Sequence, residues 1–124
     1  MADLLTSLGF AASGMQAQAG RLRTLSENIA NADTPGYQRK TISFLEMADG
    51  VQLGPVRLDR TETTRIYDPG HPLADETGHY QGSNVDLVIE IADAREAQRS
   101  YEANLKLFDQ ARQMSQSLLD LLRK

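Results

Sequence analysis

Two long segments at opposite ends of this 124-residue chain repeat apolar residues at helical spacing, and a short turn-rich stretch separates them. From Leu4 to Ile29 the apolar residues follow in steps of four and three, with Gln18 as the interruption. A second stripe runs from about Val85 to Leu121. Steps of four and three average 3.5 residues, the repeat of a left-handed coiled coil. Neither helix can bury its stripe alone, so the helices must pack on each other, on further copies, or on both.

The stripes predict which side chains form the seam through which the helices assemble. At this spacing, large apolar and aromatic residues ordinarily pack against another helix. The predicted assembly seam consists of Leu4, Leu8, Met15, Leu22, Leu25, Ile29, Ile91, Tyr101, Leu105, Phe108, Met114, Leu118 and Leu121.

The sequence therefore predicts a mainly α fold with three parts. The N-terminal helix of a coiled-coil core is expected over residues 1–33, and its C-terminal helix over residues 83–124. A short turn-rich, β-containing insert is expected over residues 34–82. Ser83 and Asn84 are the expected N-cap of the last helix, because both side chains accept hydrogen bonds from free backbone N–H groups.

A tight turn is predicted where the first helix ends. Pro35 disfavours helical backbone at Thr34, and the four residues from Thr34 to Tyr37 fit a type II turn with positive φ at Gly36. Further along, Gly54-Pro55 separates two short β-rich runs. We expect a two- or three-stranded β element with long loops.

Two asparagines lie close to the end of the first helix. Asn28 and Asn31 are well placed to cap it, since asparagine is common at helix ends. An asparagine buried between helices can instead fix their register, as it does in coiled coils. The sequence leaves both roles open.

Composition excludes several classes of function. The chain has no cysteine, so disulfides, thiolate metal sites and cysteine nucleophiles are ruled out. A formal net charge of −4 without a basic cluster opposes nucleic-acid binding. Nucleotide-binding and paired-histidine metal motifs are missing. We therefore predict a protein that is not an enzyme, with no catalytic residue, metal ligand or cofactor.

One loop could be read differently. Asp68, His71 and Asp75 are close enough in sequence for a metal site or an acid–base pair, which would suit a small metal-dependent hydrolase. Two prolines and a glycine fill the gaps between them. Because such residues ordinarily build structural turns, we interpret the loop as structural.

The N-terminal segment does not resemble a secretory signal. Asp3 occupies the place of a basic n-region, and no apolar run of signal length precedes Ser13 and Gly14. Nowhere does the chain approach the about 18 apolar residues of a transmembrane helix. We expect neither Sec-type export nor direct membrane insertion.

Two motifs resemble those of bacterial flagellar axial proteins, the family of rod, hook and hook-associated proteins. Residues 26–37, SENIANADTPGY, resemble the signature that ends the N-terminal helix in this family. Residues 67–75, YDPGHPLAD, with NVD at 84–86 and RSYEAN at 99–104, are similar to the basal-body rod proteins. The motif residues are Asn28, Asn31, Thr34, Pro35, Gly36, Tyr37, Asp68, Pro69, Gly70, His71 and Pro72.

This resemblance implies a structural subunit of the proximal rod, part of the drive shaft for motility. The partners it implies are copies of the same chain, other rod proteins, the export apparatus and proteins at the base of the rod. It also implies a periplasmic position in the flagellar basal body, reached by type III export without a cleaved signal peptide.

Two alternatives remain besides the hydrolase. Another small proximal-rod subunit would share the first motif, although the segment from Asp68 to Pro72 argues against it. A helical type III export chaperone would be a stable cytoplasmic dimer with no need for a Thr-Pro-Gly turn. Its presence in the cytosol rather than in basal bodies would distinguish it from a rod subunit.

Overall fold

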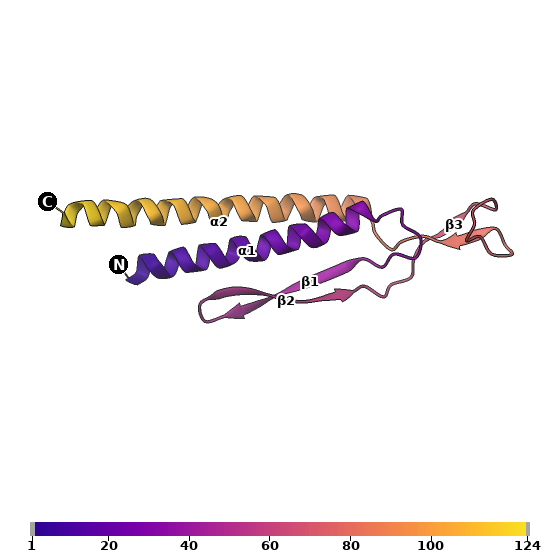
Figure 1. The fold of residues 1–124 in the computed structure, drawn as a ribbon, viewed down its shortest axis with the longest axis horizontal. Coiled ribbons are helices and arrows are strands. Elements are labelled where there is room, and N and C mark those ends of the chain that lie inside the picture. Colours follow the sequence, from indigo (N-terminus) through magenta and orange to yellow (C-terminus); the bar gives the residue numbers. More distant parts are fainter. Residues whose placement is uncertain (1, 124) are drawn as a thin grey trace.

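Two long antiparallel helices dominate the computed structural model, which describes residues 2–123 (Figure 1). The helix α1 lies between α2 and a β hairpin formed by β1 and β2 (Figure 1). Strands β3 and β4 project beyond the end of the helices that is opposite the chain termini. The predicted mainly α fold with a β-containing insert is confirmed. The elements are α1 (Ala2–Ala30), β1 (Lys40–Met47), β2 (Gly50–Leu58), β3 (Arg65–Tyr67), β4 (His79–Gln81) and α2 (Leu87–Leu122).

The register between the helices leaves the end of α2 uncovered. Asn28 contacts Glu90, and Gly14 faces Asn104, so in both pairs the residue numbers add to 118. By this register the first residue of α1 lies opposite residue 116. The last turns of α2 therefore extend past the start of α1, as Figure 1 shows at the end marked C.

Small or polar residues make up much of the contact between the helices. Buried and half-buried positions of α2 include an unbroken series in steps of four and three, and every second member of it is small or polar. This spacing is that of a coiled coil, but the coiled-coil packing itself stays a prediction. The series is Glu90, Ala94, Ala97, Tyr101, Asn104, Phe108, Ala111 and Ser115.

Strands β1 and β2 pair antiparallel, with a bulge that the sequence did not reveal. Ile42 pairs with Val56 and Phe44 with Leu53, so Ser43 faces two residues of β2, Gly54 and Pro55. Proline has no N–H to donate and is tolerated where a bulge interrupts the ladder. A single strand thus passes through the Gly-Pro pair that we expected to separate two runs.

The hairpin packs along α1 through glycines. A β-carbon at Gly20 would collide with the Leu53 side chain, and one at Gly50 would collide with Ser13. The Ser13 hydroxyl accepts a hydrogen bond from the Val51 N–H at 3.1 Å. A helical glycine costs about 1 kcal/mol relative to alanine, and at Gly20 this cost permits the close approach of the hairpin.

The predicted number of strands was wrong. The insert holds four strands in two separate two-stranded sheets, because Arg65 to Tyr67 of β3 pair with His79 to Gln81 of β4. Three-residue strands are too short to show an alternating pattern.

The predicted N-cap of α2 was also wrong. Asp86 caps the helix, and its carboxylate accepts from the Val88 N–H at 3.1 Å. Ser83 and Asn84 instead bond to other segments, with the Ser83 hydroxyl donating to the Ala32 carbonyl. A side chain engaged in tertiary contacts is not available to cap the helix.

The predicted type II turn is confirmed. The Tyr37 N–H donates to the Thr34 carbonyl at 3.2 Å, and Gly36 has a φ of 74°. The Gly36 N–H also donates to the Gln81 carbonyl at 3.1 Å, which joins the turn to β4. This turn directs the chain from α1 towards the insert.

Replacing Gly36 by alanine should destabilise the protein, whereas the same change at Gly9 should stabilise it. A β-carbon would meet no atom within 4 Å at either position, so only the backbone differs. Left-handed backbone costs an alanine roughly 1–2 kcal/mol, while a helical Gly→Ala change gains about 1 kcal/mol. Urea unfolding followed by circular dichroism measures the change in the free energy of unfolding for both variants. Equal changes would contradict the turn assignment.

Candidate assembly surface

A buried polar cluster joins the two helices to the insert. Asn28 and Glu90 are the largest fully buried side chains, each 0% exposed, although both are polar. A buried carboxylate is tolerated only when it is paired and hydrogen-bonded. We call this group the junction cluster; it consists of Asn28, Tyr37, Arg39, Lys40, Asp59, Asn84 and Glu90.

Asn28 uses its whole side-chain amide inside this cluster. Its oxygen accepts from the Tyr37 hydroxyl at 2.9 Å and from the Lys40 N–H at 2.8 Å. Its nitrogen donates to the Lys40 carbonyl at 2.8 Å and, at 3.4 Å, to a carboxylate oxygen of Glu90. Asn28 is therefore a buried bridge between segments and not a helix cap.

Asn31 acts locally at the helix end. Its side-chain nitrogen donates to the Glu27 carbonyl at 2.8 Å, and its oxygen accepts from the Thr34 hydroxyl at 3.1 Å. The Glu27 carbonyl also accepts from the Asn31 backbone N–H at 3.1 Å. The side chain of Asn31 therefore adds a second hydrogen bond at the helix end and ties the turn to the helix.

Arg39 supplies the charge that balances Glu90. Its Nε donates to Glu90 Oε1 at 2.6 Å, and its Nη1 lies 3.3 Å from a carboxylate oxygen of Asp59. The hydrogen bond with Glu90 raises the pKa of Arg39 above its ordinary value. Asn84 also holds this residue, because its side-chain oxygen accepts from the Arg39 backbone N–H at 2.6 Å.

The sequence analysis missed Arg39, Asp59 and Glu90. One signal was available, since Glu90 interrupts the apolar run from Leu87 to Ile91. A charge within such a run indicates a buried ionic contact. Its partner could not be found, because Arg39 is 51 residues away in the chain.

The structure places the two halves of the predicted assembly seam differently. The six positions on α1 are buried or half-buried against neighbouring elements. On α2, Tyr101 and Phe108 are half-buried. The other five are exposed: Ile91 42%, Leu105 41%, Met114 52%, Leu118 39% and Leu121 64%.

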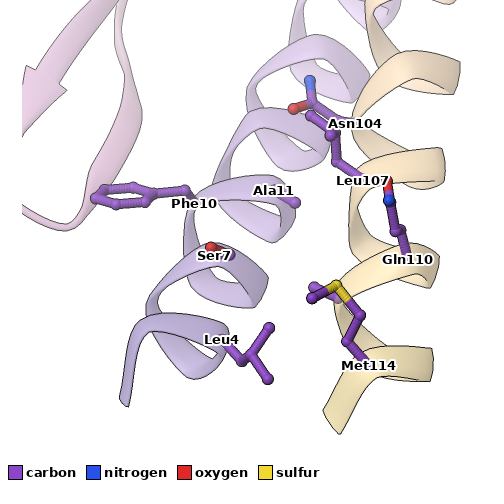
Figure 2. A pocket seen from close by; sticks show the side chains of 9 residues that line it. Leu4, Ser7, Phe10, Ala11, Asn104, Leu107, Gln110 and Met114 are labelled. Carbon is purple, nitrogen blue, oxygen red and sulfur yellow. The ribbon is translucent and has the colours of Figure 1, made fainter. Parts of the chain in front are cut away.

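A groove lies between the helices near their open end. Figure 2 shows Leu4 of α1 and Met114 of α2 pointing towards each other there. Its volume is about 430 Å³, and none of its lining residues is charged. We call it the end groove; it is lined by Leu4, Ser7, Phe10, Ala11, Asn104, Leu107, Gln110, Ala111 and Met114.

The loop that could have held a metal is organised by local hydrogen bonds. His71 stacks on Tyr80 with ring centroids 3.9 Å apart, and its Nδ1 accepts from the Leu73 N–H. One carboxylate oxygen of Asp75 accepts from the N–H groups of Thr77 and His79. Within residues 2–123, no three His, Asp or Glu side chains are grouped so that they could hold a metal ion. Over the same range, no helix has the length and apolarity needed to cross a membrane.

The chain matches two protein-family profiles, and both describe flagellar rod proteins. "Flagella basal body rod protein" matches residues 8–38, and "Flagellar basal body rod FlgEFG protein C-terminal" matches residues 76–121. The matched regions contain most of both helices together with the Thr-Pro-Gly turn. The hairpin of β1 and β2 lies between them.

Similar proteins narrow the assignment from flagellar rod proteins in general to one family of rod proteins. A flagellar basal-body rod protein FlgC of Agrobacterium fabrum is 44% identical, covering 99% of this chain and 98% of its own length. FlgC of Salmonella typhimurium is 32% identical, covering 95% and 97% respectively. FlgC of Aquifex aeolicus is 35% identical, covering 87% and 89%. The chain belongs to the FlgC family of flagellar basal-body rod proteins.

This membership decides between the functions that the sequence left open. The chain is a structural rod subunit of the flagellar basal body, and the proteins that it resembles are structural rod proteins and not enzymes. The similar proteins named here are all FlgC, which favours this subunit over the other small proximal-rod subunit, the FlgB type.

Removing the charge of Glu90 should destabilise the fold strongly. Glu90→Gln leaves Arg39 without its buried counter-charge, and breaking such a pair costs about 3–5 kcal/mol. Glu96→Gln is the matched control on the same helix. The Glu96 side chain is 67% exposed and lies 3.6 Å from Arg21, so its loss should cost less than about 1 kcal/mol. Urea denaturation measures both, and comparable small losses would show that the junction cluster does not hold the fold together.

Asp59 should make stability depend on pH in the acid range. Hydrogen bonds from Thr61, together with the Arg39 guanidinium, lower the pKa of Asp59 below its ordinary 3.8. The ionised carboxylate therefore stabilises the fold above that pH, and the contribution is lost as the pH falls through the folded-state pKa. Asp59→Asn should lower the urea midpoint at pH 7 and have a smaller effect at about pH 2.5. An equal effect at both values would contradict this assignment.

Proposed function

We propose that this subunit assembles helically in the proximal rod through its terminal helices, which pack as coiled coils with neighbouring subunits. The neighbours are further copies of the chain and other rod proteins, with contacts to proteins at the base of the rod. In this position the subunit forms part of the drive shaft that transmits motor rotation.

The observation that carries this proposal is the exposed apolar surface of α2. Ile91, Leu105 and Met114 are each more than 40% exposed in the single chain. Burying a large apolar side chain is worth roughly 1.5–3 kcal/mol, and a surface rich in such residues is typical of protein contact sites. Ile91 and Leu105 are 14 residues apart, close to four helical turns, so they lie on the same side of α2 and suit a second helix laid along it.

Small residues inside the chain support the same proposal. The buried apolar residues of the described chain are four alanines and one leucine. Alanines let the two helices approach closely, so the larger apolar side chains can remain on the outside. Those side chains are then available for contacts between subunits.

We further propose that the subunit is exported through the flagellar type III apparatus without a cleaved signal peptide and that it resides in the periplasmic rod. The similarity to flagellar basal-body rod proteins supports this proposal. Fractionation of flagellated cells tests it. A chain found as a cytosolic dimer and not in basal bodies would favour the chaperone alternative instead.

Placing a carboxylate on the exposed stripe should block assembly without unfolding the subunit. Leu105→Asp and Ile91→Asp alter side chains that are 41% and 42% exposed, so the purified subunit should keep its helix content. In the rod these carboxylates would be buried, which is strongly unfavourable. We expect loss of swimming and absence of both variants from purified basal bodies.

Gln16→Asp is the matched control, because it adds the same carboxylate at an exposed polar position of α1, away from the face of α2 that carries Ile91 and Leu105. Cells carrying this variant should swim normally. Normal swimming with Leu105→Asp and Ile91→Asp as well would refute assembly through this face of α2.

A further inference from the structure

We propose that the end groove receives the C-terminal tip of α2 from a second copy of the chain, shifted in parallel along the helix axis. The tip is the part of α2 that extends past α1, from residue 117 to residue 122. This inference rests on the proposed function, since it names the partner of one apolar surface and the direction in which copies stack.

The end groove suits an apolar partner. Phe10 is 45% exposed, Leu107 58% and Met114 52%, and none of the lining residues carries a charge. A charged partner would give up its hydration here without finding a counter-charge, which costs free energy. An apolar helix would lose no such interaction.

The apolar surface also continues beyond the end groove. Gln110 and Met114 line both the groove and a shallow strip that runs along α2 to Leu118 and Leu121. The end of this strip is not covered by α1, because α1 begins opposite residue 116. An elongated surface that follows a helix axis fits another helix laid along it.

The chain carries an occupant with these properties. The tip ends in four leucines within five residues, and all of them are exposed. A parallel shift of about nine residues, or about 14 Å at 1.5 Å per residue, brings the tip of one copy level with the end groove of another. The exposed leucines are Leu118 39%, Leu119 39%, Leu121 64% and Leu122 77%.

A charge just beyond the tip matches this shift. Met114 lies opposite Leu4 across the end groove, so a shift of about nine residues brings Arg123 of the entering copy next to Asp3. Opposite charges thus lie at the same level along the axis, and this pair favours the staggered arrangement.

This contact uses different surfaces on the two copies. A contact of that kind does not close by two-fold symmetry, so its repetition produces an open helical row. An antiparallel pair, in which each tip enters the other copy's groove, would stop at two copies. The two arrangements therefore give products of different size.

Cysteine cross-linking tests the proposal, because the chain has no cysteine of its own. The variant carries Ser7→Cys in the end groove and Leu121→Cys on the tip. Within one chain Ser7 lies opposite residue 111, so the two cysteines are about 15 Å apart along the axis. A disulfide requires Cα atoms within about 7 Å. Every disulfide must therefore join two copies.

We expect oxidation to give a ladder of covalent dimers, trimers and larger species that returns to monomer on reduction. The ladder should form in concentrated purified protein and in basal bodies from cells carrying the variant. The matched control, Ser26→Cys with Leu121→Cys, has the same substitutions at exposed positions but lies outside the end groove, and it should lose the ladder.

A second pair, Gln110→Cys with Leu118→Cys, probes the same contact if the first disturbs folding. A charge exchange adds an independent readout: Arg123→Glu should reduce the ladder, and adding Asp3→Arg should restore it.

Dimers without larger species would overturn the staggered row in favour of the antiparallel pair. Folded, assembled variants without any cross-link would overturn the inference and leave the proposed function intact. A chain missing from basal bodies even without substitutions would overturn the proposed function itself.

Discussion

The arrangement of this molecule depends on one buried carboxylate. Glu90 is fully buried between Asn28 of α1 and Arg39 of the segment before β1. Taking a carboxylate out of water is costly, and only a complete set of partners offsets that cost. The junction cluster can therefore close only when both helices and the start of the hairpin are in place. Its closure sets the register of the helices, and with it the end groove and the uncovered tip of α2.

The interior and the exterior of the helix pair use apolar residues in different ways. Inside, the buried apolar residues of the described part of the chain are four alanines and Leu25, and they contribute a small apolar area. Outside, α2 carries most of the larger apolar side chains, including Leu105 and Met114. Hydrophobic stabilisation is roughly proportional to the apolar area buried. A subunit built in this way gains stability when neighbours cover that area, as any partner that binds only the folded state stabilises it.

Local features of the structure could be predicted, and non-local ones could not. Both helices and the turn at Gly36 follow from periodicity and backbone preference, which are properties of a few neighbouring residues. The N-cap of α2 and the passage of β2 through Pro55 depend on distant partners. Ser83 could cap a helix in isolation, but in the fold its hydroxyl bonds to Ala32.

From the sequence one can read that two amphipathic helices flank an insert, that their large apolar residues are meant for packing, and that the motifs resemble those of flagellar axial proteins. Which of these residues pack inside the chain is a property of the tertiary structure. Tyr101 and Phe108 are half-buried, whereas Leu105 and Met114 on the same helix are exposed. All four belong to the predicted assembly seam, and the rotation of α2 about its axis decides which of them face α1. The contact between Glu90 and Asn28 sets that rotation, and because 62 residues separate them, no local pattern predicts it.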